Sequence, residues 1–131
     1  MTPRLRLLSV LQWIGILAGA LTWTGQHVVG YGIGQAECAA GGMHWGIEND
    51  VWQLTLTACA GLVIALAWVC SLVVFLRTRG ENYGDGPEEP RIPQGRLHFF
   101  AVAALVANVL FLAIVLMDGL AASFGVLCRQ S

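Results

Sequence analysis

Lysine is absent from this chain of 131 residues, and its seven basic residues are all arginine. Charged residues are scarce as well, at 11% of the sequence, whereas soluble domains carry roughly a quarter. Because 56% of the residues are hydrophobic, the chain is too apolar for a disordered protein and too poor in charge to cover a globule. The net charge of −1 argues against a nucleic-acid binder, which needs a basic patch. The composition therefore predicts an integral membrane protein.

Three long apolar stretches contain no Lys or Arg, over about residues 7–29, 51–76 and 97–120. Crossing a bilayer core of about 30 Å takes roughly 20 helical residues, so each stretch is long enough. A backbone in lipid must satisfy its own hydrogen bonds, so each stretch is expected to be a helix. The sequence predicts an all-α membrane protein, one domain over 1–131 with three transmembrane helices.

The arginines lie mostly on one side of these spans. Six of the seven precede the first span or fall in the linker 77–96, and only Arg129 lies on the opposite side. Because positively charged loops stay in the cytoplasm, we expect a cytoplasmic N-terminus and linker. The outer loop, 30–50, and the C-terminus then lie outside, in the periplasm if the membrane is a bacterial inner membrane. The apolar run continues past Ala20, which favours an uncleaved first helix over a signal peptide.

Small and polar side chains gather on one face of each predicted helix. Lipid gives no hydrophobic drive between helices, so such faces serve close packing and interhelical hydrogen bonds. The residues expected to pack in this way are Gln12, Gly15, Gly19, Trp23, Gln26, Gln53, Thr57, Gly61, Trp68 and Asn108. Two interpretations stay open for the amides: structural bonds between these helices, and a polar surface for another subunit or a bound cofactor.

Two of the four cysteines lie outside the spans, Cys38 in the glycine-rich outer loop and Cys128 near the C-terminus. The predicted topology places both on the oxidising side, so we predict a disulfide between them. The alternative is a zinc or copper site that adds His44 and either Glu48 or Asp50 to these thiolates. The spacing follows no zinc pattern, so we expect no metal.

Ionisable residues at membrane depth are functional candidates by default. His27 and Asp118 fall at similar depth near the outer ends of the first and third spans, which allows a hydrogen bond; the alternatives are an interfacial or structural pair and a proton relay. His27 and His98 are candidates for binding a cofactor, since histidine can ligate haem, but most of the membrane separates them. No nucleophile–base pair, phosphate-binding glycine loop or paired-carboxylate motif is present, so we expect no enzyme active site.

Two stretches carry a family resemblance: residues 19–31 (GALTWTGQHVVGY) followed by Cys38, and residues 95–101 (GRLHFFA) leading through the third span to Cys128. Together they resemble small three-helix bacterial proteins that accompany haem-copper cytochrome c oxidases of the caa3 type. The resemblance implies an accessory role in electron transport. We therefore expect a non-catalytic subunit with no cofactor of its own, which docks on larger integral membrane subunits that hold haem.

In this hypothesis the outer loop contacts a periplasmic domain such as a cytochrome. Two alternatives belong to other classes. One is a membrane anchor that binds haem or quinone through His27 or His98, and the other is a small transport or proton-conducting component that uses His27 and Asp118.

Overall fold

Three helices make up the part of the chain that the structure, a computed structural model, describes: residues 3–38, 49–79 and 92–123. They are α1 (Pro3–Cys38), α2 (Asn49–Thr78) and α3 (Ile92–Ser123), and these residues include no strand. Each helix contains a span long and apolar enough to cross a membrane. The predicted all-α architecture with three membrane-spanning helices is confirmed.

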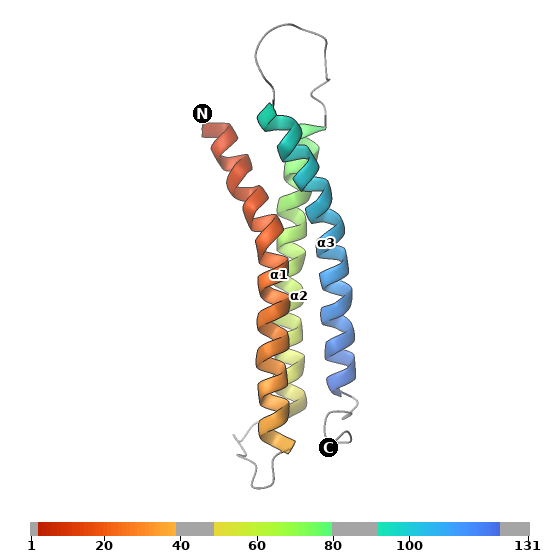
Figure 1. The fold of residues 1–131 in the computed structure, drawn as a ribbon. Helices are drawn as coiled ribbons and strands as arrows, with labels where there is room; N and C mark the ends of the chain where they lie inside the picture. Colours follow the sequence, from red (N-terminus) through yellow and green to blue (C-terminus); the bar gives the residue numbers. More distant parts are fainter. Residues whose placement is uncertain (1–2, 39–48, 80–91, 124–131) are drawn as a thin grey trace, which may run out of the picture.

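The helices run alternately up and down, side by side (Figure 1). At one end, Gly30 of α1 meets Gln53 of α2; at the other end, Thr78 of α2 meets His98 of α3. As a result α1 and α3 are parallel, and their last residues, Cys38 and Ser123, lie at the same end of the bundle. Which end faces the cytoplasm stays a prediction from the arginine distribution.

All three helices are longer than the spans expected from hydropathy. The largest difference is at the C-terminal end of α1, which continues to Cys38 through residues expected to open the outer loop at 30. Hydropathy reports only the lipid-embedded part, whereas a helix of 36 residues is about 54 Å long and extends beyond the hydrocarbon core. α3 also starts earlier than expected, at Ile92, and Pro93 suits its first turn because the missing N–H has no helical partner there.

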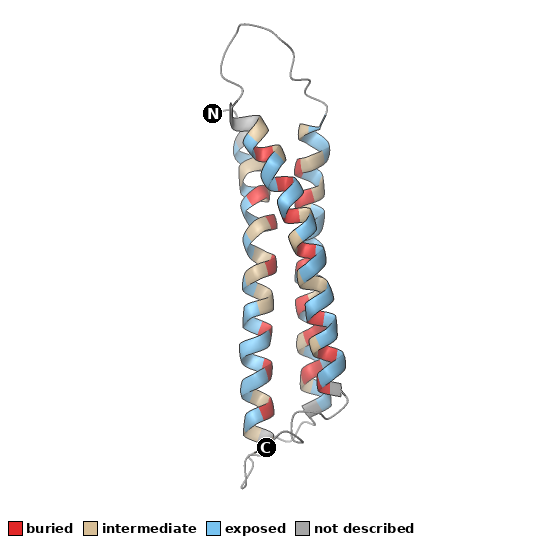
Figure 2. Cartoon of the chain, turned by 45° about the vertical axis from the view of Figure 1, so that its right-hand side comes forward, coloured by how far each residue is buried: buried red, intermediate tan, exposed pale blue. Residues whose placement is uncertain are grey.

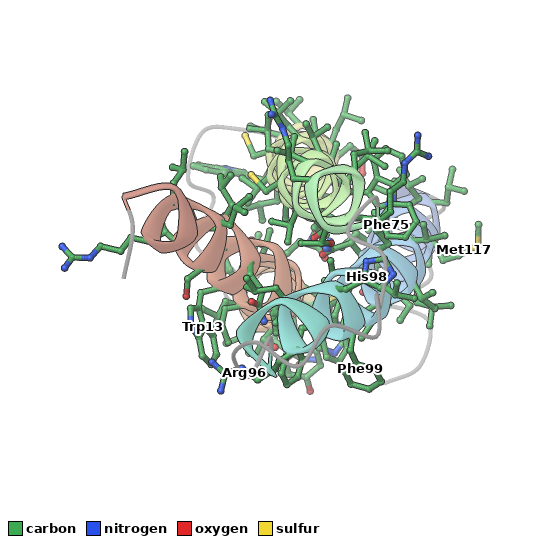
Figure 3. The ribbon with its side chains drawn as sticks, turned by 90° about the horizontal axis from the view of Figure 1, so that it is seen from above. Trp13, Phe75, Arg96, His98, Phe99 and Met117 are labelled. Atoms are coloured by element: carbon green, nitrogen blue, oxygen red, sulfur yellow. The ribbon has the colours of Figure 1, made fainter. Side chains whose placement is uncertain are left out.

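The buried positions lie on the sides of the helices that face one another (Figure 2). On α2 they alternate at intervals of four and three residues: 53, 57, 60, 64, 67, 71 and 74. This spacing is typical of left-handed helix packing. Outward positions carry large apolar side chains; Figure 3 shows Trp13, Phe99 and Met117 pointing away from the bundle.

Two apolar clusters complete the packing between the helices. Ala60, Ile64 and Val115 are buried together, with Trp23 and Phe111 against them. Nearer the other end, Val74, Leu97 and Ala101 are buried beside residues of α1 and α2. Buried polar side chains lie between these clusters, and these polar side chains form the candidate site.

Candidate functional site

Six polar side chains are buried between the helices, and we call this set the polar seam. Its members are Gln12 and Gln26 of α1, Gln53, Thr57 and Ser71 of α2, and Asn108 of α3. Because a membrane offers no water to such groups at its centre, each needs a partner inside the protein. The hydrogen bonds of the seam therefore distinguish the two interpretations of the amides: bonds between these helices, and a polar surface for another subunit or a cofactor.

Asn108 links α3 to α1. Its side chain is 1% exposed, and Nδ2 donates a hydrogen bond of 2.7 Å to the backbone oxygen of Gly15. The close approach depends on glycine, because a Cβ atom at Gly19 would overlap Oδ1 of Asn108 and one at Gly15 would overlap the Ser71 hydroxyl. At this position the amide holds the bundle together, as the structural interpretation expects.

Gln53 makes the equivalent link between α2 and the C-terminal half of α1. Its Nε2 donates to the backbone oxygen of Gly30 at 2.9 Å, and a Cβ at Gly30 would lie 3.0 Å from Oε1 of Gln53. Helical spacing already places Gly30 on the packing face of the first span, four residues after Gln26, although the predicted outer loop begins at this residue.

Thr57 packs into the gap left by Gly119 of α3. A Cβ at Gly119 would lie 2.5 Å from Cγ2 and 2.6 Å from Oγ1 of this threonine. Helical spacing places Gly119 on the same face of the third span as Asn108, but its contact with Thr57 follows from the register between α2 and α3. The contact brings the Thr57 hydroxyl up to the α3 backbone.

Four buried polar atoms of the bundle have no hydrogen-bond partner in the structure: Trp23 Nε1, Gln26 Oε1, Thr57 Oγ1 and Asn108 Oδ1. Trp23 stacks on Phe111 with ring centroids 5.7 Å apart.

The other two predicted packing residues are less enclosed: Gly61 is half-buried, and Trp68 is exposed on the outside of the bundle.

The structure brings His27 and Asp118 together, as their similar depth suggested. Nδ1 of His27 lies 3.3 Å from Oδ2 of Asp118, and the two side chains are 60% and 35% exposed. The Trp23 ring lies beside the histidine, with centroids 6.2 Å apart. Such exposure suits an interfacial pair, because both groups can reach the membrane surface. The proton-relay role stays a prediction.

His98 lies at the opposite end of α3, about 30 Å away from Asp118 at 1.5 Å per helical residue. His27 and His98 are therefore too far apart to hold one haem. Nδ1 of His98 is 3.0 Å from the Thr78 hydroxyl, and the ring stacks on Phe75 with centroids 5.1 Å apart (Figure 3). The sequence analysis missed Thr78 as a partner, because the contact depends on where α2 and α3 meet.

Cys38 is half-buried at the end of α1, and the free cysteines of the described part of the chain are Cys59 and Cys70. Cys128 lies outside the described residues, so its pairing with Cys38 stays a prediction. His44 and Glu48 lie outside them too. Within residues 3–38, 49–79 and 92–123, no three His, Cys, Asp or Glu side chains are grouped as metal ligands would be.

In comparisons with known proteins, the chain matches no family model, no curated protein and no solved structure. The arguments for its function therefore come from the arrangement of its own residues. Chemically, that arrangement consists of a polar seam that joins the helices, an exposed histidine–aspartate pair and a histidine positioned by a threonine hydroxyl.

Proposed function

We propose that this chain is a non-catalytic accessory subunit that docks on a larger membrane subunit of an electron-transport complex, respiratory or photosynthetic. The observation that carries the docking is a second, outward-facing set of glycines on α1. A Cβ at Gly25 or Gly32 would meet nothing within 4 Å, in contrast to the inner glycines at 15, 19 and 30.

Gly25 and Gly32 are seven residues apart, so they lie on one face of α1. Val28 and Val29 between them are exposed. In membranes, small residues mark the places where two helices approach closely, and glycine otherwise lowers helix stability by up to about 1 kcal/mol relative to alanine. An outward face with two glycines therefore supports contact with a helix of another chain.

The assignment to electron transport depends on the resemblance of residues 19–31 and 95–101 to proteins that accompany caa3-type cytochrome c oxidases. As parts of the same proposal, haem is held by the partner subunits, the outer loop contacts a periplasmic cytochrome domain and the chain resides in a bacterial inner membrane. The polar seam supports the same proposal, because the amides of Gln53 and Asn108 bond within the bundle and leave docking to the apolar outer surface.

The proposal is tested by purifying the tagged chain from its native membrane in mild detergent and identifying the subunits that co-migrate. We expect haem-containing oxidoreductase subunits to co-purify, and the double variant Gly25→Leu/Gly32→Leu to lose them. Ala65→Leu, on an exposed face of α2, is the matched control and keeps them. A tagged wild-type chain that is recovered from its native membrane without any other subunit contradicts the accessory role.

A second candidate function, haem binding by the chain itself, is favoured by the environment of His98. When the Thr78 hydroxyl donates to the backbone oxygen of Val74, 2.9 Å away, Oγ1 can accept a hydrogen bond from Nδ1–H of His98 at 3.0 Å. The tautomer with the proton on Nδ1 leaves a lone pair on Nε2, which is the arrangement of a metal-ligating histidine. A quinone oxygen, in contrast, accepts hydrogen bonds, so it would need an N–H group at Nε2, which this tautomer lacks.

An optical spectrum of the purified chain separates the two functions. A Soret band that disappears in His98→Ala favours haem binding by this chain. A spectrum without one, recorded after the chain has been separated from the haem-containing subunits with which it co-purifies, favours the accessory role.

A further inference from the structure

The end of the bundle where α1 finishes and α2 begins contains two unpartnered polar groups, one on each of these helices. Gln26 of α1 is 7% exposed and Thr57 of α2 is 9% exposed, and neither Oε1 of Gln26 nor Oγ1 of Thr57 has a hydrogen-bond partner. Burying an unsatisfied oxygen costs on the order of 1–3 kcal/mol, so two of them in one place require an explanation.

The register of the helices places these two groups in one layer. Gly30 contacts Gln53, and α1 and α2 are antiparallel. Gln26 is one turn before Gly30, and Thr57 is one turn after Gln53, so the two side chains occupy the next layer of the same interface. Gly119 of α3 lies in this layer too, because it contacts Thr57.

The Thr57 hydroxyl differs from the other hydroxyls of its helix. Thr55, Ser71 and Thr78 each donate to the carbonyl oxygen four residues earlier, which satisfies the hydroxyl within the helix. Thr57 makes no such bond, and its hydroxyl is turned toward the α3 backbone at Gly119. It therefore presents a donor and an acceptor to the space between the helices.

The His27–Asp118 pair indicates that water reaches this depth of the bundle. His27 and Asp118 are the neighbours in sequence of Gln26 and Gly119, and they are substantially exposed. Ionisable side chains of this kind lie where water or headgroups reach them rather than in hydrocarbon. On α3 the layer is four residues, about 6 Å, from the end of the helix at Ser123.

We propose that a buried water molecule bridges Gln26 Oε1 and Thr57 Oγ1. The water donates to the amide oxygen and accepts from the threonine hydroxyl, and its second proton goes to a helix carbonyl, which has a spare lone pair. Buried waters make about three hydrogen bonds and are found where protein groups are otherwise unsatisfied. The water completes the link between α1 and α2 at the layer beside the His27–Asp118 pair.

The substitution Thr57→Val tests the site with almost no change in shape. If the water is present, removing the hydroxyl breaks a satisfied network and leaves Gln26 without its bridge, so the thermal midpoint of the full chain in detergent falls. If the two groups are dry, removing an unsatisfied hydroxyl raises the midpoint or leaves it unchanged, which overturns the proposal. Thr55→Val is the matched control, since its exposed hydroxyl bonds only to Val51 of its own helix.

A direct measurement decides whether a lower midpoint is due to water. The full chain is labelled with ¹³C in threonine methyl groups, and the Thr57 signal is identified by its loss in Thr57→Val. We expect a cross-peak between this methyl and water. The absence of the Thr57 cross-peak overturns the proposal even if the midpoint falls, because the hydroxyl would then be bonded to protein.

Discussion

Asn108 shows how one buried amide can hold two membrane helices together. Its Nδ2 atom reaches the carbonyl oxygen of Gly15 across the α1–α3 interface, in a position with 1% exposure. Interhelical side-chain bonds in membranes contribute about 0.6–2 kcal/mol each, because the separated helices find other partners. We therefore expect the amide to contribute measurably to stability.

Asn108→Ala should lower the free energy of unfolding of the isolated chain by about 1 kcal/mol. The reason is the loss of the bond to Gly15. The measurement is a denaturation titration in mixed micelles, and the control is Val109→Ala, whose side chain faces outward next to Asn108. Equal effects of the two substitutions would show that the amide bond adds nothing to stability.

At the scale of the helix, glycines that face the inside of the bundle and glycines that face outward have opposite roles. A Cβ at Gly119 would lie within 3.0 Å of three atoms of Thr57, one of which is its Cβ. A rotation about χ1 moves Oγ1 and Cγ2 but leaves this Cβ in place, so the side chain cannot relieve the overlap. A Cβ at Gly25 would meet open space. The same residue type therefore allows close packing at one position and leaves a free surface at the other.

Gly119→Ala is expected to destabilise the isolated bundle by about 1–3 kcal/mol, the range for overpacking a tight interface. Gly25→Ala is expected to leave stability unchanged or to raise it by up to about 1 kcal/mol, because alanine is the better helix former. Thermal melts of the two variants in the same detergent compare them directly. A tolerated alanine at 119 would mean that α2 and α3 are less closely packed there than the Thr57 contact indicates.

At the scale of the whole molecule, the parallel course of α1 and α3 determines which segments can meet. The last described residues of these helices, Cys38 and Ser123, lie at the same end (Figure 1). Cys128 follows Ser123 by five residues in the sequence. The architecture is therefore compatible with the predicted pairing of Cys38 and Cys128, and the arginines predict that this end faces away from the cytoplasm.

Thiol labelling of intact cells tests this topology. We expect Cys38 and Cys128 to resist a membrane-impermeant maleimide until a reductant is added, and then to be labelled from outside. The test uses a chain with Cys59→Ala and Cys70→Ala, which removes the two free thiols of α2. Labelling of either cysteine without a reductant would exclude the disulfide, and labelling of the two from opposite sides of the membrane would exclude the predicted topology.

The sequence by itself determined the three spans, the faces on which polar and small residues gather and the similar depth of His27 and Asp118. These features follow from hydropathy and helical periodicity, which each segment carries alone. Only the tertiary structure decided the contacts that depend on register between helices, such as Gly119 with Thr57 and Thr78 with His98. The tertiary structure also decided the length of α1. Its glycine-rich C-terminal end is helical beside α2, where Gln53 donates a hydrogen bond to the backbone oxygen of Gly30.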